Sequence, residues 1–146
     1  MQPIPNQLHH IANHEFFDKG GMDVVRTDSM NRNEGELHYE LEDGVMSNIR
    51  LSDFDDPEIE LLVFLHEVGH GLILYDRLSL PQPVTYALCP MSNEGAAWER
   101  ALIVASKWNI TWSINALNTA RRAMISYLGN IQDTFKLTSI YKPGDV

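Results

Sequence analysis

The sequence predicts an α+β fold in a single domain over residues 1–146, in which a small sheet that contains an antiparallel pair packs on a central helix, with further helices beside it. A chain of 146 residues suits one hydrophobic core and is too short for two. One stretch alternates between apolar and polar residues on both sides of an Asp-Gly pair, which is typical of a β-hairpin. Later stretches carry the capping residues and the apolar spacing of helices.

Composition excludes several classes of protein. Hydrophobic residues make up 44% and charged residues 21% of the chain, which is ordinary for a globular protein and argues against wholesale disorder. No apolar run approaches the ~20 residues that span a bilayer, so we expect no membrane partner. The N-terminus lacks the basic and apolar regions of a secretory signal. A single cysteine, Cys89, excludes an intramolecular disulfide framework, which favours a cytoplasmic location.

The charge is negative and uneven. A net charge of −9 argues against nonspecific nucleic-acid binding, which needs clustered Lys and Arg, so we expect no nucleic-acid partner. Residues 1–76 hold 16 acidic and 4 basic residues, whereas residues 77–146 hold 4 acidic and 7 basic residues. The acidic half is either a solvated face or a surface that attracts a cationic partner.

The first half of the chain predicts a helix and then a hairpin. Residues 8–18 are expected to form a short helix that ends at Gly20–Gly21. Residues 36–42 and 45–52 alternate between apolar and polar side chains, and Asp43–Gly44 between them suits a type I′ turn.

A buried helix is predicted next, over about 57–75. Asp56 caps its start, and Pro57 suits the first helical position because no useful backbone donor is lost there. The stretch 61–65 is apolar all round, so this helix is expected to be enclosed by other elements rather than to lie on the surface.

The C-terminal half predicts two more helices after a loop. The loop opens at Pro81 and is expected to reach Asn93, since prolines and polar residues interrupt any periodic pattern there. Helices follow over about 94–108 and 113–127, and Gly129 is expected to end the last one.

The central helix contains an HExxH sequence formed by His66, Glu67 and His70. Histidines four residues apart project from the same helix face, close enough together to bind one Zn²⁺. Glu67 points about 100° further around the helix, beside the metal, where it could hold and deprotonate a water. A helix this apolar would leave three ionisable groups stranded unless a metal or a hydrogen-bonded network satisfied them.

A catalytic zinc site needs a third protein ligand, and Glu94 is the first candidate. Ala97, Ala101 and Ala105 lie along the same helical stripe as Glu94. Small residues beside a carboxylate allow this helix to approach the central one closely. Glycines at 69 and 71 should thin the facing helix in the same way.

Two other acidic residues remain as candidates for the third ligand. Asp76 follows His66 at the distance found in zincins that use an aspartate, but Ile73 stands where that arrangement has a turning glycine. Glu99 lies about one turn after Glu94 and off the alanine stripe, which suits a surface position. We rank Glu94 first, Asp76 second and Glu99 third.

These residues resemble the gluzincin-type metallopeptidases, and most closely the ImmA/IrrE family. The family pattern is a hairpin with an Ile-x-Leu strand, an HExxH helix, and a helix whose leading Glu is the third zinc ligand. Here Ile49-Arg50-Leu51, the His66–His70 segment and Glu94 follow in that order, and the resemblance covers about residues 36–105. It implies a zincin-like fold and cleavage of regulatory proteins in a bacterial or phage cytoplasm.

We therefore expect a zinc-dependent endopeptidase with Zn²⁺ on His66, His70 and Glu94, and with Glu67 as the general base. A protein or peptide substrate is expected to add as an extended strand along a sheet edge near 45–52. Two alternatives stay open. One is a binding or regulatory module that keeps zinc only as a structural staple, and the other is an acidic, phage-type inhibitor of a host protein.

Overall fold

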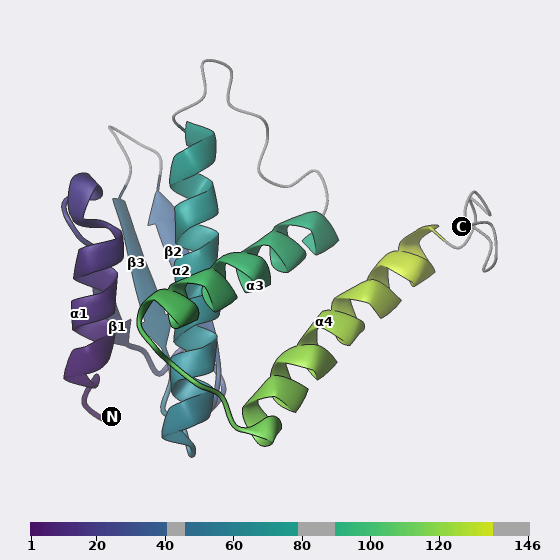
Figure 1. Ribbon diagram of the computed structural model, residues 1–146, viewed down its shortest axis with the longest axis horizontal. Helices are drawn as coiled ribbons and strands as arrows, with labels where there is room; N and C mark the ends of the chain where they lie inside the picture. Colours follow the sequence, from purple (N-terminus) through teal and green to yellow (C-terminus); the bar gives the residue numbers. More distant parts are fainter. Residues whose placement is uncertain (41–45, 79–89, 136–146) are drawn as a thin grey trace.

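The computed structural model describes residues 1–40, 46–78 and 90–135, and within them it confirms the α+β class. In chain order the elements are α1 (Asn6–Glu15), the short 3₁₀ helix η1 (Phe17–Lys19), β1 (Asp23–Arg26), β2 (Gly35–Glu40), β3 (Met46–Leu51), α2 (Pro57–Leu78), α3 (Pro90–Lys107) and α4 (Ile114–Phe135) (Figure 1). No helix in these ranges combines the length and the apolar character needed to cross a bilayer.

The sheet is mixed, and its strand order is β1-β3-β2. The predicted hairpin is confirmed as the antiparallel pair of β2 and β3, in which Leu37 lies opposite Ile49. The predicted turn at Asp43–Gly44 lies outside the described residues. β1, which the sequence did not predict, runs parallel to β3. The prediction that residues 45–52 form a sheet edge is therefore wrong, because β3 is paired on both sides and β2 forms the edge instead.

β1 has no local sequence signal because distant residues hold it in place. It is four residues long, too short to show a clear alternation, and its partner lies about 25 residues later in the chain. Arg26 at its end is buried, donates to the carbonyl of Ser52 at 2.6 Å, and lies 2.5 Å from the carboxylate of Glu60 on α2. This ion pair joins the sheet to the first turn of α2.

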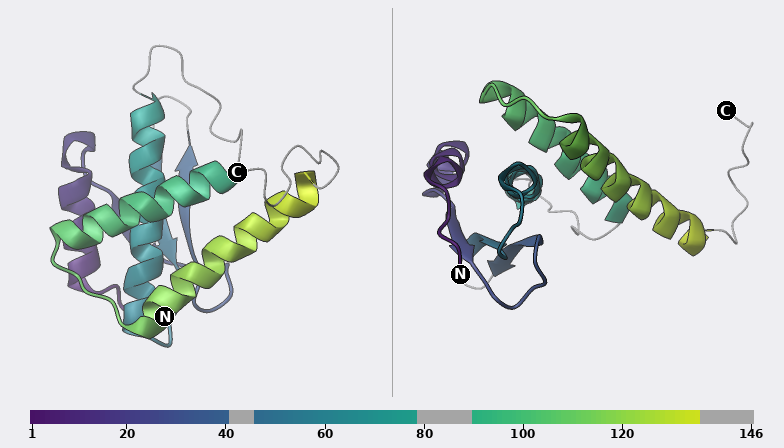
Figure 2. Two further views of the ribbon diagram at one scale, coloured as in Figure 1. Left: turned by 45° about the vertical axis from the view of Figure 1, so that its right-hand side comes forward. Right: turned by 90° about the horizontal axis from the view of Figure 1, so that it is seen from below.

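The elements form three layers, as the view from below in Figure 2 shows. The sheet is one layer, α1 and α2 lie side by side on one of its faces, and α3 and α4 lie beyond α2. α2 is thus covered by the sheet, by α1 and by α3, which confirms the prediction that the apolar stretch 61–65 is enclosed. The central helix therefore holds His66 and Glu67 in buried positions.

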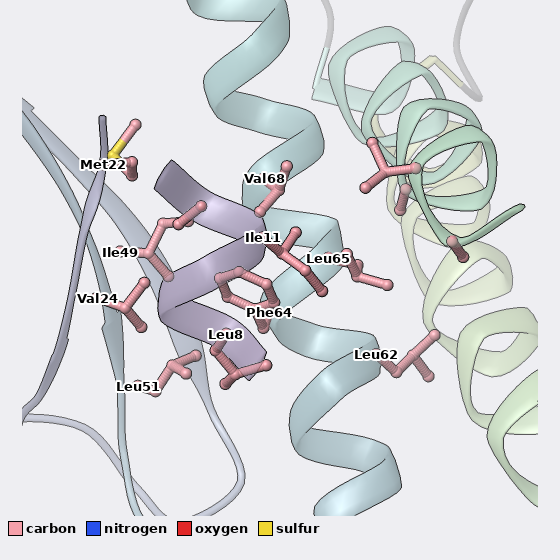
Figure 3. Close-up of a cluster of buried hydrophobic side chains, with 14 of the residues drawn as sticks. Leu8, Ile11, Met22, Val24, Ile49, Leu51, Leu62, Phe64, Leu65 and Val68 are labelled. Atoms are coloured by element: carbon pink, nitrogen blue, oxygen red, sulfur yellow. The ribbon is translucent and has the colours of Figure 1, made fainter. Parts of the chain in front are cut away.

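The core fills the space between the sheet, α1 and α2. Figure 3 shows part of it: Leu8 and Ile11 of α1, Met22 and Val24 at β1, Ile49 and Leu51 of β3, and Leu62, Phe64, Leu65 and Val68 of α2. Burial of large apolar side chains on this scale contributes about 1.5–3 kcal/mol each to folding before entropy is counted. Ile49 and Leu51 are fully buried, so these alternate residues form the inward side of β3.

Several helix boundaries differ from their predictions. α1 ends at Glu15, and Gly20 and Gly21 then adopt φ of +85° and +88°, the left-handed conformation that favours glycine at a chain reversal. α3 begins at Pro90 rather than Glu94, in keeping with the preference of proline for a first helical position. α4 runs through Gly129 to Phe135, because one glycine costs a helix only about 1 kcal/mol.

Candidate metal centre

Three side chains from two helices meet at the candidate metal site. His66 and His70 lie on the same face of α2, and Glu94 lies in the first half of α3, which crosses α2. The two Nε2 atoms of His66 and His70 are 3.1 Å apart. The carboxylate of Glu94 spans both imidazoles, with Oε2 at 2.7 Å from Nε2 of His66 and Oε1 at 3.1 Å from Nε2 of His70. The site is therefore assembled by one helix crossing.

The ligand atoms of His66, His70 and Glu94 are close enough to share one metal ion. They all lie within 4.8 Å of one another, so this group could hold a metal ion. Ligands bound to zinc at ~2.0–2.1 Å in a tetrahedron are separated by about 3.3 Å, close to the distances found here. Oε2 of Glu94 is buried and has no aligned hydrogen-bond donor among the described residues, although Nε2 of His66 is near. Electron-pair donors brought together in this way need a shared cation or proton between them.

Glu67 lies beside the group and in the same pocket. The pocket has a volume of about 350 Å³ and is lined by Gly35, Glu36, Leu37, Tyr39, His66, Glu67, His70 and Glu94. Glu67 is buried, and the backbone N–H of Leu37 on the edge strand β2 donates a hydrogen bond to its carboxyl group. The base expected from the sequence is therefore held between α2 and the edge of the sheet.

Burial is the largest single influence on the pKa of each of the two histidines. It lowers the pKa of His66, because the nearby Glu94 carboxylate offsets it only in part. Burial would also lower the pKa of His70, but the contact with Glu94 and the negative charge of Glu67 outweigh it and raise the pKa.

The two carboxyl groups respond to burial in different ways. Burial would raise the pKa of Glu94, but its contacts with His66 and His70 lower it to about 2, so Glu94 is an anion over the whole neutral range. Burial raises the pKa of Glu67 to about 7, even though the Leu37 N–H favours the ionised form. Glu67 thus has the proton affinity of a group that can take and release a proton near neutral pH.

The crossing of α2 over α3 depends on Gly69. A Cβ built on Gly69 would lie 2.2 Å from the carbonyl oxygen of Ala97, so the helix backbones touch. Ala97 and Ala101 are both buried, which confirms that the alanine stripe faces the central helix. Gly71 behaves differently from its prediction, because a Cβ there would meet the ring of Phe16 rather than α3.

The other two candidates for the third ligand lie elsewhere. Asp76 is exposed, and its Oδ2 lies 2.6 Å from the guanidinium of Arg100, where the two side chains join α2 to α3 outside the pocket. Glu99 is also exposed. Neither belongs to the group of His66, His70 and Glu94.

Two features of the pocket escaped prediction from the sequence. The alternation of residues 36–42 indicates the inward side of Leu37 but carries no information about where its N–H points. The ring of Trp98 is buried and lies against the imidazole of His66. The positions of these residues along the chain do not indicate the contact between Leu37 and Glu67 or the contact between Trp98 and His66.

In comparisons with known proteins, no protein-family model, curated protein or solved structure matches the chain. The case for a function therefore rests on the geometry of the pocket.

Proposed function

We propose that this protein is a zinc-dependent endopeptidase in which His66, His70 and Glu94 hold the metal and Glu67 is the general base. One observation carries the proposal: three metal-ligand atoms converge in a pocket that also holds a buried carboxyl group and is bordered by a sheet edge. A purely structural zinc site has no use for a base beside the metal, and it is usually closed by four protein ligands. Two imidazoles and one carboxylate are one of the donor sets of catalytic zinc sites.

Each residue has a defined task in hydrolysis. When bound, zinc supplies a Lewis acid that polarises the scissile carbonyl and lowers the pKa of a water molecule. Glu67 takes a proton from the attacking water and then gives it to the departing amine. The Leu37 N–H holds the carboxyl group of Glu67 toward the pocket. Glu94 remains ionised throughout, because its pKa lies near 2.

The edge strand β2 supports a peptide as the substrate. Ser52 N–H donates to the carbonyl of Glu34 at 2.9 Å, so in this antiparallel pair the main-chain groups of even-numbered β2 residues face β3. Those of Gly35, Leu37 and Tyr39 therefore face the open side, and the same three residues line the pocket. An extended peptide added at this edge would pass the metal ligands. We propose this edge, in place of the one near 45–52, as the binding track.

Substitution of Glu67 tests the proposal. Glu67→Gln keeps the size of the side chain and can still accept the Leu37 N–H, but it takes no proton. Zinc content, measured by mass spectrometry of the metal, should stay near one per chain, while hydrolysis of a mixed peptide library falls ~10²–10⁴-fold. Glu99→Gln, an exposed glutamate on α3, is the matched control and should keep full activity.

The outcomes separate the candidate functions. Equal cleavage by the wild type and Glu67→Gln would contradict the proposal. A wild-type protein that holds zinc but cleaves neither the library nor a host lysate would favour a zinc-stabilised binding module.

A further inference from the structure

The rings of Trp98 and His66 lie against each other in the buried part of the metal centre. Their ring centroids are 4.2 Å apart and their planes are inclined by 33°. Trp98 is only 6% exposed and follows Glu94 by four residues on α3, so one face of α3 presents both the carboxylate ligand and the indole ring. The close approach at Gly69 and Ala97 brings that face against α2.

The imidazole of His66 lacks the support that metal-ligating histidines usually have. Such a histidine normally donates its second ring N–H to a carboxylate, a carbonyl or a water, which fixes the orientation of the ring. Nδ1 of His66 is buried and has no hydrogen-bond partner among the described residues. The last side-chain torsion of histidine has a broad distribution of angles, so an imidazole without support would adopt several orientations.

Apart from the polar contacts of Nε2 at the metal site, ring contacts orient the imidazole of His66. The ring of His70 meets it edge-on, with centroids 4.6 Å apart and planes at 82°, and the tilted indole of Trp98 lies against it on another side. An indole whose centroid is 4.2 Å away restricts rotation of the imidazole, since a turned imidazole would overlap the indole. Nε1 of Trp98 also has no hydrogen-bond partner in the described part of the chain, so packing alone places the indole.

We propose that Trp98 is a positioning residue for the metal centre, which holds the His66 ring by stacking in the orientation that points Nε2 at the metal. The inference rests on the metal site of the proposed function and goes beyond it, because it assigns to an indole face the task that a hydrogen-bond acceptor performs in most such sites. It also explains why a large aromatic residue occupies a position so close to the ligands.

The test compares aromatic and non-aromatic replacements by metal binding, without any need for a substrate. Trp98→Phe keeps a ring, whereas Trp98→Met and Trp98→Leu fill space without one. Trp108→Phe is the control, because Trp108 directly follows the C-terminus of α3 and donates to Glu15 at 2.8 Å, away from the pocket. Each metal-free variant is first checked for folding by circular dichroism. Zinc affinity is then measured by chelator competition, and the ligand geometry by the visible spectrum of bound Co²⁺.

We expect Trp98→Met and Trp98→Leu to weaken zinc binding ~10–100-fold, the usual loss when the support of a ligand is removed. They should also change the Co²⁺ spectrum. Trp98→Phe should keep a Co²⁺ spectrum like that of the wild type and an affinity near it, and Trp108→Phe should leave both unchanged even if it lowers the melting temperature.

Three results would overturn the inference: wild-type affinity and spectrum in a folded non-aromatic variant, equal losses in Trp98→Phe and Trp98→Met, or an equal loss in Trp108→Phe. If neither non-aromatic variant folds, a Trp98→Phe protein with a changed Co²⁺ spectrum overturns it, and one with an unchanged spectrum supports it. If the wild-type protein binds neither Zn²⁺ nor Co²⁺, the proposed metal site itself is contradicted. Wild-type binding without hydrolysis would remove only the endopeptidase.

Discussion

Gly69 and Ala97 bring α2 and α3 into backbone contact, with room for no side chain between them: a Cβ on Gly69 would lie 2.2 Å from the carbonyl oxygen of Ala97. Gly69 directly precedes His70, and Ala97 lies three residues after Glu94 and directly before Trp98. The contact therefore sets the distance between the imidazole ligands on one helix and the carboxylate on the other. It links the packing of the core to the geometry of the metal centre.

Gly69→Ala should damage both stability and metal binding. The new methyl group meets a helix backbone, which has little freedom to yield, so the helices must move apart at a cost of about 1–3 kcal/mol or more. Glu94 would then withdraw from the histidines, and zinc affinity should fall. Gly95→Ala on α3 is the control, because a Cβ there meets nothing within 4 Å. It should leave the affinity unchanged and stabilise the helix by about 0.5–1 kcal/mol. Equal denaturation midpoints for the two variants would contradict this account.

His66→Ala and His70→Ala should each abolish stoichiometric metal binding, because two remaining ligands seldom retain zinc. The wild type should hold about one zinc per chain after dialysis, as measured by mass spectrometry of the metal. His10 offers a control, since it is an exposed histidine on α1 and should be replaceable by Ala without loss of metal. Zinc retained by the double variant of His66 and His70 would place the metal elsewhere.

Glu94→Ala should weaken zinc binding more than ~100-fold, beyond the loss that follows when only a supporting residue is removed. Asp76→Ala and Glu99→Ala should keep wild-type affinity, because the first carboxylate pairs with Arg100 and the second is exposed. Isothermal titration of the metal-free proteins measures all three. A loss confined to Asp76→Ala would show that the crossing of α2 and α3 is not where the metal lies.

Glu67→Gln should make the metal-free protein more stable at pH 8 than the wild type. Burial raises the pKa of Glu67 from 4.5 to about 7, so the folded state holds the proton more tightly than the unfolded chain. The contribution of protonated Glu67 to the free energy of unfolding is fully present below pH 4.5, and it is lost as the pH rises through about 7. A pKa shift of this size corresponds to a loss of about 3 kcal/mol in the free energy of unfolding. Urea unfolding in a chelator at pH 4.5 and 8 should show the two proteins diverging only at the higher pH, and parallel curves would contradict the burial of an ionisable Glu67.

The sequence by itself determined the local features. The two strands of the hairpin follow from the alternation of residues 36–42 and 45–52, and the HExxH spacing places two imidazoles on one helix face whatever surrounds them. The alanine stripe after Glu94 also identified the face of α3 that meets α2, since only small side chains permit such an approach. Each of these features depends on residues close together in the chain, so it can be recognised from the period at which residue types recur.

Tertiary structure decided which groups those local features meet. β1 pairs in parallel with β3, a long-range contact with no short-range signal, and this pairing moves the sheet edge from β3 to β2. As a result, the N–H of Leu37 faces Glu67 and the open strand borders the metal ligands. The contact of Trp98 with His66 likewise arises from the angle at which two helices cross. Such contacts join residues far apart in the chain, and their geometry is set by how whole elements pack, which the order of residues within any one element does not encode.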